Sequence, residues 1–364
     1  MFSLLIFIFA LSVLIIVHEL GHFWAARRKG VLVEEFGLGY PPRALGKKIG
    51  ETLYSLNWLP LGGFVRILGE VEYGEKIPEK LKKRSLSSQS LKTRFLVTVA
   101  GVGMNLVLGV AIFAIVYSVL GIPRRTDFIT VVDVSQDSPA QAAGIESGDR
   151  ILVVQAGEFT QDIDQIDALI NFANEHAGSQ IKLLIGRNNQ EDFWAEVVPR
   201  QNPPEGQGAM GVVISQTEIY MPPLWQRPFW GAKEGFQEAY FWGKTIVLGI
   251  GQTLASLAQG KAPQNIAGPV GIYQATSTIQ KESGNWAVLH FFGVLSVNLA
   301  VVNLLPFPAL DGSRIWLLAW EGVAKKRPNP KIEFWLYQIG IFFLILLLVL
   351  VTFADIRRLK NSGV

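Results

Sequence analysis

Two histidines and a glutamate lie inside an apolar segment at the start of the chain. The run 2–26 holds no Lys, Arg or Asp, and its ionisable side chains are His18, Glu19 and His22. Residues four apart share one face of a helix, so both imidazoles can bind one metal ion while Glu19 lies beside them. This spacing is typical of zinc hydrolases, in which a base that is not a ligand activates water. The sequence therefore predicts a Zn²⁺ site with His18 and His22 as ligands and Glu19 as the base.

The motif lies deep inside a predicted membrane span. At 1.5 Å per residue, His18 is roughly 14 Å from the basic cluster 27–29, within a hydrocarbon layer of about 30 Å. Ionisable side chains at that depth are costly and mark functional sites. A signal peptide is the alternative, but the segment lacks a basic start and a small-x-small cleavage site. We therefore interpret 1–26 as the first transmembrane helix.

Composition restricts both the class of protein and the metal ligands. The chain has 364 residues, of which 49% are hydrophobic, so membrane spans must be combined with a soluble module. It has no cysteine, so a metal site must use histidine and carboxylate. The net charge of +3 says little about partners, because the charges are segregated along the chain. No nucleic-acid partner is expected.

The charges predict the orientation in the membrane. Residues 27–94 hold fourteen Lys and Arg against seven Asp and Glu, whereas residues 121–285 hold eleven against eighteen. Basic residues near spans favour the cytoplasmic side. We therefore expect 27–94 inside the cell, 121–285 outside, and the active site toward the cytoplasm.

A β-prone stretch at 52–68 follows the first span, with a proline and the pair Gly62-Gly63 at its expected turn. It is either a surface hairpin or, because it is strongly apolar, a hairpin that dips toward the bilayer. An exposed strand edge beside a protease centre can hold an extended substrate by strand addition. On this hypothesis Gly62, Gly63 and Phe64 contact substrate.

The second span and the segment after it carry further patterns. Small residues between 100 and 109 predict close helix packing, and Asn105 either joins helices or contributes to substrate binding. Residues 138–152, with the order Ser-Pro-Ala-x-x-Ala-Gly-Ile-x-x-Gly-Asp-Arg-Ile-Leu, resemble a PDZ domain. PDZ domains bind polypeptide by strand addition, although some act only as steric filters.

The third span ends in Asn303-Leu-Leu-Pro-Phe-Pro-Ala-Leu-Asp311-Gly. Two prolines break the helix at membrane depth, and a carboxylate follows at once. Asp311 is therefore the expected third metal ligand, with the cap of the helix expected at 312–323 as its alternative role. Between the PDZ segment and this span, 231–259 is expected to form a helix on the outer membrane face, and 268–272 a turn.

Together these patterns predict a polytopic α-helical membrane protein with four transmembrane helices, a membrane-associated β-hairpin and one inserted extracytoplasmic PDZ domain. The segments expected are a first transmembrane helix at 1–26, a cytoplasmic segment with the hairpin at 27–94, a second transmembrane helix at 95–120, the PDZ domain at 121–215, an extracytoplasmic amphipathic region at 216–285, the third transmembrane helix with the Asp-Gly motif at 286–323, and a cytoplasmic loop with the fourth helix at 324–364.

The combined motifs resemble the site-2 protease family of intramembrane metalloproteases, most closely the bacterial regulator-of-sigma-E type. The resemblance places metal ligands on His18, His22 and Asp311, the base on Glu19, and a substrate-contacting amide on Asn303. It implies a multi-pass protein of the bacterial inner membrane that cleaves single-span membrane proteins, such as anti-sigma factors and signal-peptide remnants, after another protease has shortened them. Two departures are a single PDZ domain where many members have two, and Val102 where proline is common.

Two other classes of function compete with this hypothesis. In a non-catalytic membrane adaptor the PDZ module would bind partners, and the metal site would be structural or vestigial. Glu19 weighs against this alternative, because a structural metal site needs no base. A zinc transporter would need a ladder of carboxylates or histidines along several spans, which the sequence lacks.

Overall fold

The computed structural model describes residues 2–70, 77–188, 190–204, 206–260 and 267–361. They belong to two compact units. One unit is formed by Met1–Val119 with Trp225–Val364, and the other by Leu120–Leu224. Each is described by itself.

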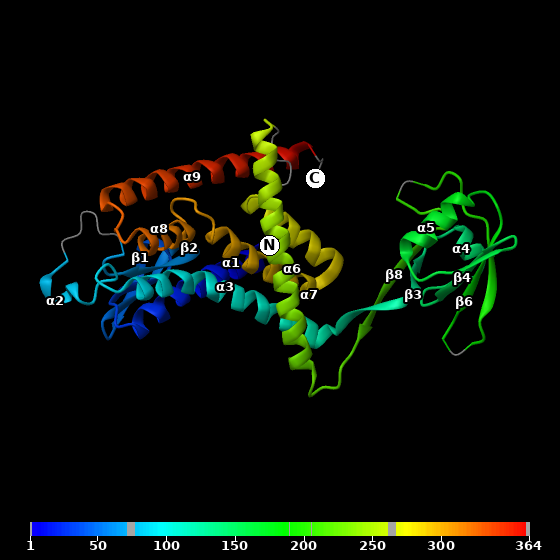
Figure 1. Cartoon of the computed structure of the whole chain (residues 1–364), viewed down its shortest axis with the longest axis horizontal. Coiled ribbons are helices and arrows are strands. Elements are labelled where there is room, and N and C mark those ends of the chain that lie inside the picture. Colours follow the sequence, from blue (N-terminus) through cyan, green and yellow to red (C-terminus); the bar gives the residue numbers. More distant parts are fainter. Residues whose placement is uncertain (1, 71–76, 189, 205, 261–266, 362–364) are drawn as a thin grey trace. The chain divides into compact units, whose positions relative to one another are not determined.

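The first unit is built on long apolar helices (Figure 1). Among the described residues, four helices are long and apolar enough to cross a membrane, the same number as the spans predicted from the sequence. They are α1 (Phe2–Arg28), α3 (Leu91–Leu120), α7 (Pro269–Asn303) and α9 (Pro330–Asn361). The chain is thus a multi-pass membrane protein.

Helix α7 begins earlier than the sequence analysis expected. The segment 268–272 was predicted to be a turn, and this prediction was wrong, because Gly268 is the N-cap and Pro269 the first helical residue. Proline is common in the first turn of a helix, because the backbone N–H groups there make no hydrogen bond within the helix. Gly284 then interrupts the helix with φ 79° and ψ −174°. The helical segment after this kink starts close to the predicted start of the third span.

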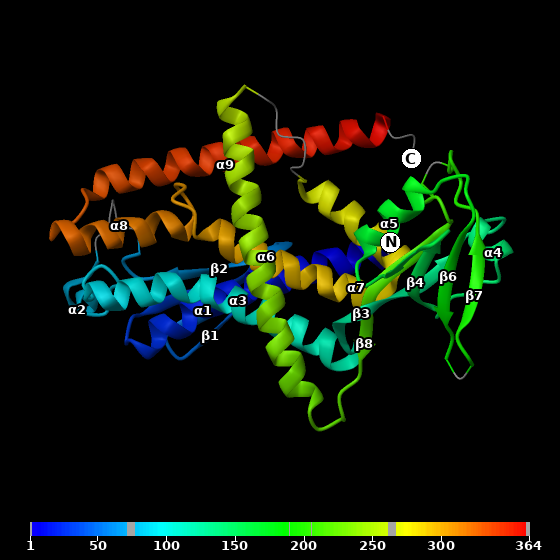
Figure 2. The same ribbon diagram turned by 45° about the vertical axis from the view of Figure 1, so that its right-hand side comes forward.

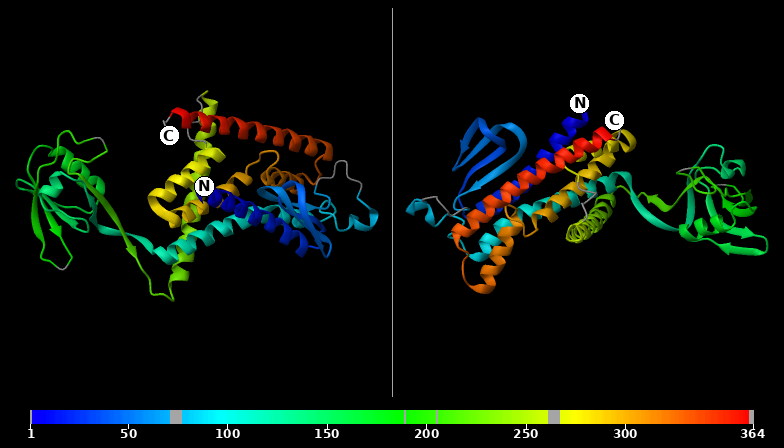
Figure 3. Two further views of the ribbon diagram at one scale, coloured as in Figure 1. Left: turned by 180° about the vertical axis from the view of Figure 1, so that it is seen from behind. Right: turned by 90° about the horizontal axis from the view of Figure 1, so that it is seen from above.

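The hairpin turns more often than the sequence predicted. Strands β1 (Val33–Ile49) and β2 (Thr52–Ile67) pair antiparallel and turn at Gly50, which has a φ of 62°. The chain also reverses direction within β2, between 56 and 63, so Gly62, with a φ of 86°, and Gly63 lie where the sequence predicted a turn. Residues 35–38 pair both with 53–56 and with 63–66. The hairpin thus folds back on itself and lies against α1 (Figure 3).

The remaining helices of the first unit are shorter or run crosswise. Helix α6 (Arg227–Ala258) crosses the long helices (Figure 2). It approaches α3 through Gly231 and Gly235, where an added Cβ would overlap Ser118 and Ala114. The others are the short α2 (Glu79–Lys82) and α8 (Asp311–Ala324).

The second unit is a six-stranded sheet with two helices. Its strands follow the order β7-β6-β4-β3-β8, with β5 paired to β4. Ser138 caps the short helix by accepting a hydrogen bond from Gln141 N, as its sequence position indicates. Strand β8 was not predicted. The elements are β3 (Ile122–Val134), α4 (Pro139–Ala142), β4 (Arg150–Ala156), β5 (Phe159–Asp162), α5 (Ile166–Glu175), β6 (Ile181–Gly186), β7 (Phe193–Val197) and β8 (Val212–Tyr220).

Candidate metal centre

Two glycines bring α1 and α3 close enough to share a site. A Cβ at Gly21 would lie 2.3 Å from the carbonyl oxygen of Ala100. A Cβ at Gly101 would lie 2.3 Å from Nε2 of His22, so this glycine leaves the space that the imidazole fills. His22 Nδ1 is then 2.8 Å from the Val97 carbonyl oxygen of α3. The small residues of the second span therefore serve the site as well as helix packing.

The two imidazoles of α1 meet the carboxylate of Asp311. His18 Nε2 lies 3.0 Å from Asp311 Oδ2, and His22 Nε2 lies 3.1 Å from the same oxygen. The two Nε2 atoms are 3.3 Å apart. Both histidines are buried, at 8% exposure. Residues 289 positions apart in the chain thus converge on one point, and three donor atoms face it.

The turn between α7 and α8 delivers Asp311. Ala309 adopts a positive φ of 76°, and a Cβ at Gly312 would collide with the Leu305 carbonyl, so α8 starts directly against the end of α7. The N-cap of α8 is Leu310, and Asp311 is the first helical residue. The cap position considered for Asp311 is therefore held by its neighbour, and its carboxylate is turned toward the histidines.

Glu19 is held by the hairpin. Its Oε2 accepts a hydrogen bond of 3.1 Å from the backbone N–H of Val65. Val65 lies in the segment of β2 that pairs with 35–38, and this segment passes the site. The sequence placed the hairpin near a protease centre but gave no sign of this contact.

The side chains surround a cavity of about 490 Å³. Among the residues expected at the site, His18, Glu19, His22, Asp311, Asn303, Gly63 and Phe64 line it. Asn105 is not among the lining residues and is fully buried behind His18. Gly62 does not line the cavity either, although a Cβ there would lie 3.2 Å from Ile15, which does.

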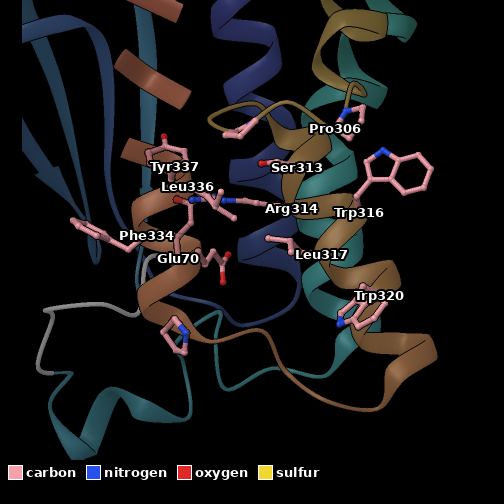
Figure 4. A pocket seen from close by; sticks show the side chains of 13 residues that line it. Glu70, Pro306, Ser313, Arg314, Trp316, Leu317, Trp320, Phe334, Leu336 and Tyr337 are labelled. Carbon is pink, nitrogen blue, oxygen red and sulfur yellow. The ribbon is translucent and has the colours of Figure 1, made fainter. Parts of the chain in front are cut away.

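Several lining residues escaped the sequence analysis. Tyr40, Glu70, Arg314 and Tyr337 come from β1, the loop after β2, α8 and α9. The last three also line a neighbouring apolar cavity of about 470 Å³, in which Arg314 points toward Glu70 (Figure 4). No local pattern marks these residues, because only the packing of distant elements brings them together.

Four apolar spans with two histidines and a carboxylate converging at their core define a membrane-embedded metallohydrolase. The model of peptidase family M50 matches residues 6–347, and the chain belongs to this family. A zinc metalloprotease RasP of Geobacillus kaustophilus is 27% identical over 98% of both chains. The same-named protein of Bacillus licheniformis is 26% identical over 98% of this chain and 99% of its own length.

A third relative is more similar in sequence. A protein of Clostridium perfringens, named provisionally as a zinc metalloprotease, is 36% identical over 95% of this chain and 96% of its own length. The chain is therefore a zinc metallopeptidase of the site-2 protease family. This confirms the family, the enzyme class and the metal that the motifs indicated.

Proposed function

We propose that the chain cleaves peptide bonds of membrane proteins within the membrane, with zinc held by His18, His22 and Asp311. The observation that carries this proposal is the convergence of the three donor atoms within 4.8 Å of one another. Zinc is bound by nitrogen and carboxylate oxygen at about 2.0–2.2 Å in tetrahedral geometry, which places neighbouring donors about 3.3 Å apart. The separations of 3.0, 3.1 and 3.3 Å fit this donor set. Zinc supplies an acidified water and a polarised carbonyl when bound.

The residues of the chain then perform the proton transfers. Glu19 takes a proton from the attacking water and later gives it to the leaving nitrogen. The Val65 N–H fixes one carboxylate oxygen, which leaves the other oriented for this exchange. Asn303 lies on the cavity wall and is placed to hold the unwound substrate strand or to donate to the developing oxyanion.

The substrate must be extended before cleavage, because the carbonyls of a helix are already hydrogen-bonded and shielded. The β2 segment with Gly63, Phe64 and Val65 follows the cavity and offers backbone groups for strand addition. Exposed apolar side chains on the hairpin, including Trp58 at 70% and Leu45 at 69%, support its contact with the bilayer.

The physiological role is proposed from the family and the second unit. The substrates are single-span membrane proteins, such as anti-sigma factors or signal-peptide remnants, that another protease has already shortened. The order of motifs at 138–152 supports a PDZ domain on the extracytoplasmic side. Strand β8 is at the end of the sheet order, where an added peptide strand can pair. Residues 27–94 and the active site face the cytoplasm of a bacterial inner membrane.

A non-catalytic adaptor is the second candidate, in which this same unit would bind partners without cleavage. Glu19 weighs against it, because its contact with Val65 orients a base that an adaptor does not need. An adaptor would bind a membrane peptide and leave it intact.

The test uses the purified full chain in detergent with a fluorescent single-span peptide. We expect about one zinc per chain, cleavage within the apolar segment, loss of cleavage after chelation, and recovery with added zinc. His22→Ala should lose both zinc and cleavage. Peptide binding without cleavage by the zinc-loaded chain would support the adaptor and reject the proposal.

A further inference from the structure

If His18 binds zinc through Nε2, as proposed above, its second ring nitrogen, Nδ1, needs a hydrogen-bond acceptor. The inference below therefore rests on the proposed function. A neutral imidazole carries one proton, and the nitrogen that binds metal cannot hold it. Because Nε2 faces Asp311, the proton must be on Nδ1. A buried N–H group without an acceptor is unfavourable, and ligating histidines nearly always donate this proton to an oxygen.

His22 meets the same need through the backbone of α3. Its Nδ1 is 2.8 Å from the carbonyl oxygen of Val97, so the proton on Nδ1 has an acceptor and Nε2 is free. Val97, Gly101 and Asn105 are spaced by four residues and share one face of α3. That face therefore passes both histidines, with Val97 beside His22 and Asn105 beside His18.

The amide of Asn105 lies against the ring of His18. Its Nδ2 is 3.3 Å from His18 Nδ1. In this orientation two donors would face each other once His18 binds metal. At the same time, Asn105 Oδ1 is buried and has no hydrogen-bond partner, in a side chain with 0% exposure. A half-turn of the amide exchanges nitrogen and oxygen at the same positions and places an acceptor against Nδ1.

We propose that Asn105 is a positioning residue of the zinc site, whose side-chain oxygen accepts the Nδ1 proton of His18. It thereby fixes the ring and keeps the proton away from Nε2. The carbonyl oxygen of Asn105 separately accepts a 2.8 Å hydrogen bond from Ser296 Oγ of α7, so the backbone and the side chain of Asn105 have different partners. This role replaces the substrate contact considered for Asn105 in the sequence analysis.

The test compares three variants of the full chain. Asn105→Leu keeps the approximate volume but removes the acceptor, so zinc affinity should fall by about 10- to 100-fold. Asn105→Asp restores an acceptor oxygen and should stay within about threefold of the wild type. Ser296→Ala removes the neighbouring hydrogen bond at the same helix contact but leaves the amide, and should also bind zinc normally. Affinity is measured by competition with a chromophoric chelator on monodisperse protein.

A spectroscopic measurement separates ring positioning from general loss of structure. With cobalt(II) in place of zinc, Asn105→Leu should shift the visible absorption bands, whereas Asn105→Asp and Ser296→Ala should keep the wild-type bands. Wild-type zinc affinity in Asn105→Leu, or an equal loss of zinc affinity in the Leu and Asp variants, would overturn this inference and leave the proposed ligand set standing. Unchanged zinc affinity in His18→Ala would overturn the proposed ligand set, and this inference with it.

Discussion

Arg314 of α8, three residues after Asp311, donates a hydrogen bond to Glu70 in the loop after β2. Their side chains are 19% and 28% exposed, so the ion pair is shielded from solvent. The guanidinium carbon also lies 5.5 Å from the centre of the Tyr337 ring in α9. This pair therefore joins three elements around the metal cavity and fixes the start of α8, from which Asp311 reaches the histidines.

Arg314→Gln should weaken both the fold and the activity. Removing one partner leaves the carboxylate of Glu70 shielded and unpaired, which costs about 1–3 kcal/mol, and loosens the position of Asp311. We expect a lower melting temperature and about a tenfold fall in cleavage of the membrane peptide. The double variant with Glu70→Gln leaves no unpaired charge and should recover part of the stability.

A matched control uses an ion pair on the surface. Arg84 pairs with Glu51, and their side chains are 38% and 63% exposed. Exposed pairs contribute little to stability, so Arg84→Gln should leave the melting temperature and the cleavage rate unchanged. Equal losses in the Arg84 and Arg314 variants would contradict the role given to the shielded pair.

Glu19→Gln tests the base. Glutamine keeps the size of the side chain and can still accept the hydrogen bond from Val65 N–H, but it cannot take a proton from water. Zinc should remain near one per chain while peptide cleavage falls by at least about 100-fold. Glu79→Gln, at a side chain 86% exposed, is the control and should be fully active. Loss of zinc in Glu19→Gln would make Glu19 a structural residue, and normal cleavage would exclude it as the base.

Asp149 should make the stability of the second unit depend on pH. Burial raises the pKa of this carboxyl, but hydrogen bonds from Arg187 and from the Glu146 N–H outweigh it and hold the pKa below its ordinary value. A lowered pKa in the fold stabilises the unit above the unfolded pKa of about 3.9, and this contribution is lost as the pH falls below it. Protection of the unit against hydrogen exchange should therefore weaken in acid.

The variant Asp149→Asn separates this contribution from general acid effects. It should lower protection in Leu120–Leu224 at pH 7 by about 1–3 kcal/mol and show a smaller further loss in acid. Glu196→Gln breaks an exposed pair with Lys182, in which the side chains are 52% and 49% exposed, and should change little. An acid response as large in Asp149→Asn as in the wild type would show that other groups carry it.

Labelling from outside the cell tests the orientation. The chain has no cysteine, so a single introduced thiol reports one position. Lys82 in α2 and Ser179 before β6 are both exposed. In intact cells an impermeant thiol reagent should modify Ser179→Cys and not Lys82→Cys, and both should react after the membrane is opened. The reverse pattern would require the opposite topology.

The sequence predicted the parts of the fold that depend on local patterns. Apolar runs located the four spans, because a membrane demands a fixed length of apolar helix. The His-Glu-x-x-His spacing identified the face of α1 that carries the site, since four residues make about one helical turn. The Asp-Gly motif after a broken helix identified a candidate partner for that face.

The contacts between distant elements could not be predicted in this way. The sequence indicated the turn at Gly62-Gly63, but neither the turn at Gly50 nor the pairing of 35–38 with two segments of β2. Neither the Val65 contact to Glu19 nor the pair of Arg314 with Glu70 follows any spacing rule, since each joins separate elements. That the buried amide oxygen of Asn105 has no hydrogen-bond partner follows only from the packing of α1 against α3.

Asp311→Asn tests whether the third ligand crosses the fold. Asparagine keeps an oxygen at the same place but removes the charge that the two imidazole nitrogens face at 3.0 and 3.1 Å. Zinc binding should weaken and cleavage should be lost, while membrane insertion is unaffected. Asp355→Asn is the control, because this buried carboxylate accepts hydrogen bonds from Gly268 N and Gly271 N at the start of α7, away from the metal centre. It should retain zinc.

A helix-cap role for Asp311 predicts a different result, since asparagine caps a helix about as well as aspartate. Full zinc content and full activity in Asp311→Asn would therefore reject the ligand assignment.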